Sequence, residues 1–259
     1  MALGVLADAV LADPARAHPV AGFGGAAGAL ERRMWADSRG RGALFTALGF
    51  GSVTACAIAA TALFPRPPGR LLLTATCTWA VLGGTSLARE AGRISRTLTD
   101  GDLTAARRRL PALCGRDPSA LDADGLVRAA MESVAENTSD AAVAPLFWGA
   151  AAGVPGLVGY RAVNTLDAMV GHRSERYGRF GTAAARLDDI ANWLPARMCC
   201  ALTAAGAPLV GGSPAAVLRG WRRDGRAHAS PNAGPVEAAF AAALGVRLGG
   251  PVRYSWGVA

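Results

Sequence analysis

The hydrophobic pattern of the chain is dominated by long stretches without a charged side chain. A membrane-spanning α-helix needs about 20 mostly apolar residues. Four uncharged stretches approach that length: Ala43–Phe64, Leu71–Ala88, Ala141–Tyr160 and Met198–Leu218. The first two are bounded by arginines and separated by the turn sequence PRPPGR, so we expect a helical hairpin over residues 43–88.

The other two uncharged stretches each contain two prolines. Pro145 and Pro155 lie in the third stretch, and Pro208 and Pro214 lie in the fourth. Proline breaks or kinks a helix, and such breaks survive in membranes where the backbone is buried in protein or lines a cavity. The pattern therefore predicts kinked spans or re-entrant segments.

A polar segment over residues 89–140 separates the hairpin from the third stretch. Asp100 or Asp102 can cap a short helix that ends in the arginines 107–109. A second helix should start near Asp122 or Asp124. Its apolar positions recur at three- and four-residue spacing: Leu126, Val127, Ala130, Met131 and Val134.

No alternating β pattern and no internal repeat is present, so the predicted fold is an all-α, polytopic membrane protein. We expect one membrane-embedded domain over residues 1–259, with a motif-bearing region at 131–250. Composition agrees, because only 18% of residues are charged and the mean hydropathy is +0.25, whereas soluble domains carry about 25% charged residues.

Charge and cysteine content exclude several kinds of functional site. The net charge is +8, and all 27 cationic side chains are arginines, which excludes a Schiff-base lysine and a Walker A lysine. No nucleic-acid-binding motif occurs, so we expect no nucleic acid partner and ascribe the basic excess to membrane-flanking loops. The five cysteines form no C-x-x-C pair and are read as small buried hydrophobes.

The positive-inside rule gives a topology that conflicts with a single site built from the polar motifs on either side of residues 141–160. With four full spans, most arginines lie on the side that holds the N-terminus, residues 89–140 and residues 219–259, which makes that side cytoplasmic. Glu132–Asp140 and Arg161–Arg197 would then be separated by the bilayer. A single site built from both requires the stretch 141–160 to be re-entrant or broken.

Acidic residues mark the end of the polar segment. Glu132, Glu136 and Asp140 are spaced i, i+4, i+8 and fall within an arc of about 80° on a helix, opposite the apolar face. Such a stripe can bind Mg²⁺ through carboxylate oxygens. The alternative is an ordinary solvated face. Asn137, at the edge of the apolar face, needs a polar partner.

Further polar residues follow at helical spacing. Arg161, Asn164 and Asp167 directly follow an uncharged stretch, where ionisable groups are costly and usually functional. An interfacial anchor is the alternative. The run HRSERYGRFG holds Arg173, which could bind phosphate or carboxylate, or face lipid phosphates.

The last polar motifs precede and follow the fourth stretch. Asp188 and Asn192 are spaced i, i+4, and Arg186 and Asp189 are spaced i, i+3. They suggest a second cation site, or internal pairing of Arg186 with Asp189. Near the C-terminus SPNAG contains Ser230 and Asn232, which bind a ligand or simply cap the following helix.

Taken together, these motifs resemble one family. The runs ESVAENTSD, APLFW, YRAVNTLDAMVG, RLDDIANWLPAR, SPNAG and EAAFAAALGVRLGG are similar to those of the membrane cobinamide-phosphate synthases of cobalamin biosynthesis, the CobD/CbiB family. Asp8, the run ADP and HPVAGFG fit the same pattern. The resemblance covers most of the chain and is weakest over residues 27–88. Members usually continue to another apolar helix after RLGGPVRYSWG, so we expect this sequence to be C-terminally short relative to the family.

The resemblance implies a multi-pass enzyme of the cytoplasmic membrane, with its active site facing the cytoplasm. Members join aminopropanol, or its phosphate, to a propionate carboxyl of adenosylcobyric acid and give adenosylcobinamide or its phosphate. The step is an ATP-dependent amide formation, so the enzyme is a carbon–nitrogen ligase. Expected partners are this corrinoid, the amine, the lipid bilayer and other corrinoid-pathway enzymes. The alternative class is a transporter or binder of corrinoid or another anionic solute.

The chemistry of this reaction suggests roles for the motif residues, with ATP and Mg²⁺ as cofactors. We expect Mg²⁺ to be held by Glu132, Glu136 and Asp140. The catalytic acids or bases would come from Glu136, Asp167, Asp188 and Asp189. Phosphate or propionate groups would be bound by Arg161, Arg173 and Arg186. The amide-rich corrinoid periphery would be oriented by Asn137, Asn164, Asn192, Ser230 and Asn232.

Overall fold

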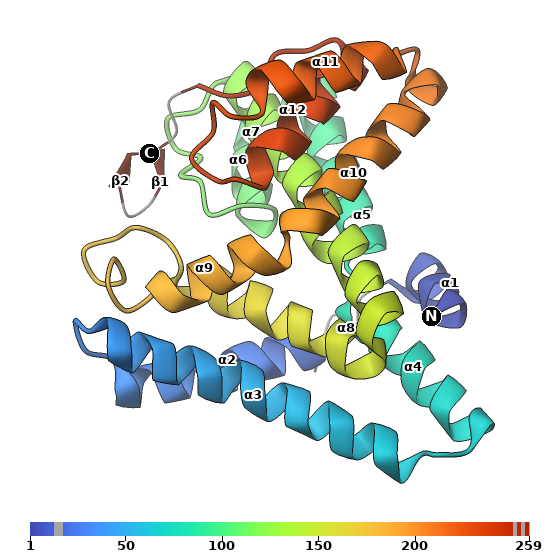
Figure 1. Ribbon diagram of the computed structural model, residues 1–259. Coiled ribbons are helices and arrows are strands. Elements are labelled where there is room, and N and C mark those ends of the chain that lie inside the picture. The colour runs from blue at the N-terminus through green and yellow to red at the C-terminus, as the bar shows by residue number, and fades with distance from the viewer. Residues whose placement is uncertain (13–17, 251–252, 255–256, 259) are drawn as a thin grey trace. The chain divides into compact units, whose positions relative to one another are not determined.

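The computed structural model describes residues 1–12, 18–250, 253–254 and 257–258. Asp13 and Pro14 of the ADP motif lie outside the described residues. Helices dominate (Figure 1), which confirms the predicted all-α class. The described strands are two-residue segments, β1 (Arg253–Tyr254) and β2 (Gly257–Val258), and they pair antiparallel.

The chain divides into two compact units, each built from two separate segments. Unit 1 comprises Met1–Gly84 and Asp140–Asn192, and unit 2 comprises Thr85–Ser139 and Trp193–Ala259. The expectation of one membrane-embedded domain stays a prediction, and each unit is described by itself below.

Unit 1 is built around a kinked helix. Its elements are α1 (Ala2–Leu11), α2 (Pro19–Met34), α3 (Arg39–Leu63), α4 (Pro67–Val81), a π-helical turn (Ser139–Val143) of which unit 1 holds residues 140–143, α8 (Ala144–Val170) and α9 (Thr182–Ala191). α3 and α4 follow each other across a short turn, and both pack on α8. The core joins α2, α3, α8 and α9 through buried Met34, Phe45, Leu166, Val170 and Phe180.

The kink in α8 lies where the prolines predicted one. Gly153 has φ 64° and ψ −152°, a conformation open to glycine alone, and Pro155 follows two residues later. Pro145 instead occupies the first turn of α8, where a missing N–H costs nothing. The third apolar stretch is therefore a broken helix, as expected.

Unit 2 consists of shorter helices. They are α5 (Gly84–Thr99, whose first residue belongs to unit 1), α6 (Leu103–Arg109), a 3₁₀ turn (Leu110–Ala112), α7 (Ala123–Thr138), α10 (Trp193–Gly206), a 3₁₀ turn (Ala207–Val210), α11 (Pro214–Asp224) and α12 (Ala233–Leu244). The predicted caps are confirmed, because Asp102 accepts from the Ala105 N–H and Asp122 from the Gly125 N–H, each at 2.8 Å.

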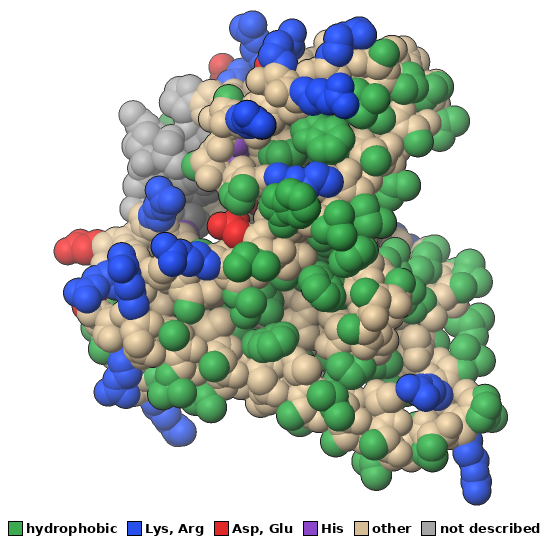
Figure 2. Space-filling view, in the orientation of Figure 1, with side chains coloured by type: hydrophobic (Ala, Val, Ile, Leu, Met, Phe, Trp, Pro, Cys, Tyr) green, Lys and Arg blue, Asp and Glu red, His purple; other side chains and the backbone are tan. Residues whose placement is uncertain are grey.

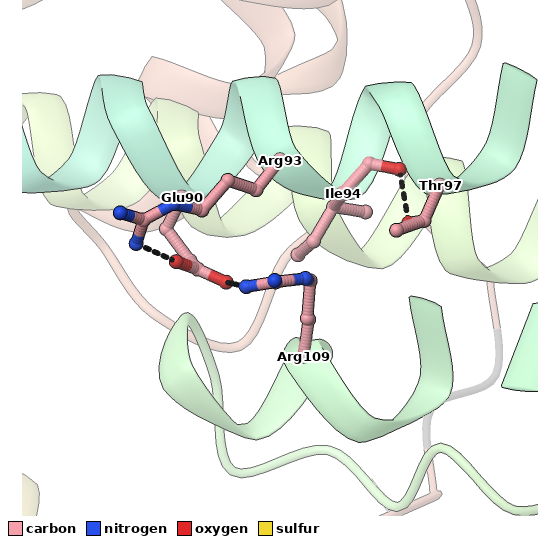
Figure 3. A network of polar contacts seen from close by, with 5 residues as sticks. All are labelled: Glu90, Arg93, Ile94, Thr97 and Arg109. Atoms are coloured by element: carbon pink, nitrogen blue, oxygen red, sulfur yellow. Dashed lines mark hydrogen bonds and ion pairs between the residues drawn. The ribbon is translucent and has the colours of Figure 1, made fainter. Parts of the chain in front are cut away.

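One part of unit 2 is held by an ion-pair network between α5 and α6. The Glu90 carboxylate accepts from Arg93 at 2.9 Å and from Arg109 at 3.1 Å (Figure 3). Beneath it, Ile94, Leu110 and Leu126 are fully buried and form the local core. Arg109, predicted only to favour the end of α6, thus also joins that helix to α5.

Four helical stretches of the described chain are long and apolar enough to cross a membrane: Arg39–Leu63, Pro67–Thr99, Ala123–Val170 and Trp193–Val210. The predicted stretch Leu71–Ala88 is interrupted at Leu82–Gly83, between α4 and α5. The predicted stretch Met198–Leu218 is broken, as its two prolines predicted, because Pro208 lies in a 3₁₀ turn, Gly211 adopts a left-handed conformation and Pro214 begins a new helix.

Apolar side chains cover the outside of the long helices. Leu44, Leu48 and Ile58 of α3 are about half exposed, and Leu72 of α4 is 69% exposed. Figure 2 shows these apolar surfaces along α3 and α4, with arginines near the helix ends. A soluble helix would bury this stripe, so the surface indicates a membrane protein.

Candidate functional site

The polar centre of unit 1 is an acid–amide cluster formed by the π turn, α8 and α9. Asp140 lies in the π turn, Asn164 and Asp167 in α8, and Asp188 in α9. Single π turns inside helices are frequent at functional sites. Here the Ala141 carbonyl of the turn accepts from the Gly83 N–H at 3.1 Å, which satisfies a backbone oxygen left free by the irregular turn.

Asn164 connects the acids of this cluster. Its Nδ2 donates to Asp140 Oδ2 at 3.3 Å and to Asp188 Oδ1 at 3.4 Å, while its Oδ1 accepts from Arg161 Nη1 at 3.2 Å. Asn192 Nδ2 donates to the other oxygen of Asp140. Residues from three separate sequence motifs, RAVNTLD, RLDDIAN and the end of ENTSD, thus form one network.

Asp188 is buried within this network. Its exposed fraction is 8%. Burial raises the pKa of its carboxyl well above the usual value, and the negative charges of Asp140 and Asp167 raise it further. A buried carboxyl whose pKa is raised binds a proton more tightly than a free carboxyl does, which suits it to accept a proton from a substrate.

The rim of the cluster carries opposite charges. Burial raises the pKa of Asp189, and the charge of Arg173 lowers it. Arg173 and Arg186 are exposed, whereas Arg161 is partly buried. The cluster therefore has a carboxylate-rich interior and an arginine-bearing edge.

The loop that carries Arg173 is fixed by α2. Buried Glu31 accepts from Arg176 Nη2 at 2.8 Å and from the Tyr177 hydroxyl at 3.3 Å. The Arg176 guanidinium lies 4.6 Å from the Trp35 ring centre, and Trp35 Nε1 donates to the Arg176 carbonyl at 3.1 Å. Arg176 thus serves as a structural anchor of the loop, and exposed Arg173, whose charge acts on Asp189, is the loop's candidate for binding an anion.

Unit 2 holds a second buried ionic group. Glu132 accepts from Arg116 Nη2 at 2.6 Å and from the Gly249 N–H at 2.6 Å. Burial and the Glu132 charge raise the pKa of Glu237 to about 7, although the Arg116 charge acts in the opposite direction. This group ties the loop before α7 and the segment after α12 to α7.

Other candidate residues of unit 2 make structural contacts. Asn137 donates to the Ser133 carbonyl within α7 at 2.9 Å. The Ser230 hydroxyl accepts from the backbone N–H groups of Asn232 and Ala233, so the capping interpretation of SPNAG is confirmed. Asn232 Oδ1 accepts from Arg197 Nη1 at 2.8 Å.

The predicted orientation of α7 is right for buried Leu126 and Ala130 but wrong for Glu132, which was expected opposite the apolar face and is buried. Its buried side is formed by Leu126, Ala129, Ala130, Glu132, Ser133 and Ala135, whereas Val127 is exposed. The ion pair with Arg116 compensates the burial of Glu132, and a partner from outside the helix is invisible to periodicity. The helix also ends at Thr138, and the π turn after it removes Asp140 from the regular stripe.

Comparison with known proteins identifies the chain's relatives. The family model described as "CobD/Cbib protein" matches residues 1–259. A Mycobacterium tuberculosis protein named "Cobalamin biosynthesis protein CobD" is 57% identical over 255 residues, which cover 97% of this chain and 80% of the relative.

The chain belongs to the CobD/CbiB family.

More distant relatives with the same printed name support this assignment. The Rhodobacter capsulatus protein is 42% identical over 241 residues, covering 92% of this chain and 76% of the relative. The Chromobacterium violaceum protein is 43% identical over 261 residues, covering 97% and 81%. No solved structure matches this chain. The chain is thus a cobalamin biosynthesis enzyme with helices that are long and apolar enough to cross a membrane.

The expected magnesium site of this family member does not have a fitting donor set. Both oxygens of Glu132 already have partners, and both oxygens of Asp140 accept from amides. Across the described residues, no group of three or more His, Cys, Asp or Glu side chains could hold a metal ion. Magnesium binding stays a prediction, and no chemical step below is assigned to it.

The structure of unit 1 brings together Asp140, Arg161, Asn164, Asp167, Asp188, Asp189 and Asn192 of the predicted site. Glu136 and Asn137 lie on α7 of unit 2, and Ser230 and Asn232 lie at the start of α12.

Sequence reasoning missed Tyr160, which is 3% exposed beside this cluster, and the anchoring residues Glu31 and Arg116. A signal for Tyr160 existed, since it directly precedes Arg161 at the end of an uncharged stretch.

Proposed function

We propose that this CobD/CbiB-family chain forms the amide bond between aminopropanol, or its phosphate, and a propionate carboxyl of adenosylcobyric acid. The product is adenosylcobinamide or its phosphate, and the enzyme is an ATP-dependent carbon–nitrogen ligase of the cytoplasmic membrane. The observation that carries this proposal is the buried acid–amide cluster of unit 1, in which Asn164 joins Asp140 and Asp188.

Amide formation requires an activated carboxyl and an uncharged amine. When bound, ATP would convert the propionate into an acyl phosphate or acyl adenylate. Arg161 and Arg173, with Arg186 on the same helix as Asp188, supply positive charge for the phosphate and propionate oxygens. Arg161 donates to Asn164 and the charge of Arg173 acts on Asp189, so these two arginines lie beside the acids of unit 1.

The second requirement is a proton acceptor, because an ammonium has no free electron pair for attack. Asp188 meets it, since burial and the charges of Asp140 and Asp167 raise the pKa of its carboxyl. The ammonium gives one proton to the carboxylate, and the freed amine attacks the acyl carbon and displaces the phosphate or nucleotide group. Asn164 and Asn192 hold Asp140 and Asp188 in place.

A reconstituted assay tests the proposal. The full chain, purified in detergent, is incubated with adenosylcobyric acid, ATP, Mg²⁺ and either amine, and corrinoids are identified by mass spectrometry. The expected result is an amide-linked corrinoid that forms only when both ATP and an amine are present. Detergent removes any gradient, so binding of adenosylcobyric acid without product under all of these conditions would instead indicate a transporter or binder.

A further inference from the structure

A tyrosine that sequence reasoning missed has an unusual position in unit 1. The side chain of Tyr160 is 3% exposed, and its hydroxyl is buried without a hydrogen-bond partner among the described residues. Tyr160, Asn164 and Asp167 are spaced i, i+4 and i+7 on α8, so the Tyr160 side chain lies on the helix face that carries the acid–amide cluster. A buried hydroxyl without a partner costs free energy and calls for a missing ligand.

The acceptors of the cluster are only partly satisfied. Asp140 accepts from Asn164 and Asn192, and Asp188 accepts from Asn164. Among the described residues, no hydrogen bond or ion pair reaches the Asp167 carboxylate, although Asp167 is partly buried. Asp167 and Tyr160 are therefore the two side chains of this helix face whose polar atoms lack a hydrogen-bond partner among the described residues.

The net negative charge of the acid–amide cluster favours a cationic ligand. Four carboxylates, those of Asp140, Asp167, Asp188 and Asp189, lie near two cations, Arg161 and Arg173. An anion would add to the repulsion. A primary ammonium brings one positive charge and three donors, which suit a carboxylate and a hydroxyl oxygen. The described side chains offer no three-residue donor group for a metal ion.

We propose that Asp167 and Tyr160 bind the primary ammonium of the small amine substrate, the carboxylate as its ion-pair partner and the hydroxyl as a hydrogen-bond acceptor. This assignment rests on the proposed function, since that reaction supplies the amine. The Tyr160 hydroxyl oxygen then accepts a hydrogen bond from the ammonium, which gives the buried hydroxyl a partner.

The backbone beside Asp167 is built to leave room for this carboxylate. A Cβ on Gly171 would lie 1.8 Å from Asp167 Oδ1 and 2.8 Å from the Asp167 carbonyl oxygen. Any side chain at Gly171 therefore displaces the Asp167 carboxylate. Gly171 gives a second way to perturb the site without changing its charge.

Equilibrium binding of radiolabelled aminopropanol to the purified full chain tests the proposal without turnover. We expect Asp167→Asn to weaken binding about tenfold or more and Tyr160→Phe to weaken it severalfold, because each loses a charged or neutral hydrogen bond to the ammonium. Gly171→Ala should act like Asp167→Asn. The control Asp224→Asn, at an exposed acid paired with Arg223, should bind like the parent chain. 1,2-Propanediol, which lacks the ammonium, should not compete.

The KM values for the two substrates distinguish amine binding by Asp167 and Tyr160 from a purely structural role. In variants that keep the parent thermal midpoint, KM for the amine should rise while KM for adenosylcobyric acid stays within about twofold. If Asp167→Asn and Tyr160→Phe both keep the parent affinity for the amine and the enzyme still forms the amide, the ammonium site is wrong and the proposed reaction stands. Mn²⁺ binding that is lost in Asp167→Asn would also overturn it in favour of a metal. Amine binding that depends on Asp167 in a chain that forms no amide would support the ammonium site and reject the proposed reaction.

Discussion

At the scale of single residues, the cluster in unit 1 depends on one amide group. Asn164 Nδ2 is the donor shared by Asp140 and Asp188, and Asn164 Oδ1 accepts from Arg161. Asparagine offers both a donor and an acceptor without charge, whereas aspartate at this position would add a further repulsive carboxylate. The residue therefore lets acids from two elements approach one another.

Removal of this amide should destabilise unit 1. Asn164→Ala leaves two buried carboxylates short of a donor, and hydrogen bonds to charged groups contribute about 1.5–3 kcal/mol each. We expect a lower thermal midpoint in detergent. Thr165→Ala is the matched control, because the Thr165 hydroxyl only bonds the Arg161 carbonyl of its own helix. Equal midpoints for the two variants would show that the network does not hold the unit together.

A second residue-scale prediction concerns pH and unit 2. Burial raises the pKa of Glu237 from 4.5 to about 7. A raised folded-state pKa means that the folded protein binds this proton more tightly, so the stability it contributes is present below about pH 4.5 and is lost as pH rises through about 7. The loss amounts to about 3 kcal/mol at most.

Glu237→Gln should remove this dependence, because glutamine stays neutral. The parent chain should unfold at a lower temperature at about pH 8 than at about pH 5.5, and the variant should show a smaller difference. Exposed Glu175 provides the control, since Glu175→Gln removes an acid outside unit 2. If the unfolding temperatures of the parent and of Glu237→Gln depend on pH in the same way, titratable groups other than Glu237 cause the pH dependence.

At the scale of elements, the broken helix α8 positions the site. Its second half carries Arg161, Asn164 and Asp167, and the break at Gly153 sets the direction of that half within unit 1. Gly153→Ala forces a side chain into a conformation that only glycine adopts, at a cost of about 1–3 kcal/mol. We expect a lower thermal midpoint and weaker amide formation.

Gly51→Ala is the control for that substitution. Gly51 lies inside the regular helix α3, and a Cβ there would meet nothing within 4 Å. Alanine favours the helix there, so the control should be neutral or slightly stabilising. If Gly153→Ala proved as stable and active as Gly51→Ala, the break would have no role in placing the site.

The elements also show what the sequence could and could not predict. Spacing correctly grouped Asn164 with Asp167 and Asp188 with Asn192, and the prolines correctly predicted the break in α8. The buried side of α7 was mispredicted, because the Arg116–Glu132 ion pair and the Gly249 contact connect residues far apart in sequence. Single-helix periodicity contains no information on such partners. Pro208 and Pro214 likewise predicted a break in the fourth stretch, and the structure has one between α10 and α11.

At the scale of the whole molecule, four apolar helical stretches and an exposed apolar surface describe a membrane protein, and its relatives place it in cobalamin biosynthesis. The acid–amide cluster lies in unit 1, whose helices α3 and α4 present apolar side chains outward. The proposed reaction of a small amine with a large anionic corrinoid would take place at this polar centre.

In the proposed reaction, the acid–amide cluster of unit 1 is the place where the amide bond forms. The most direct measurement is the rate of ATP-dependent adenosylcobinamide formation by purified Asp188→Asn, compared with Asp224→Asn at the exposed acid of α11. Loss of a general base costs about 10²–10⁴-fold in rate, so we predict at least a hundredfold lower turnover for Asp188→Asn and a parent-like rate for Asp224→Asn. Near-parent turnover in a correctly folded Asp188→Asn variant would contradict the account.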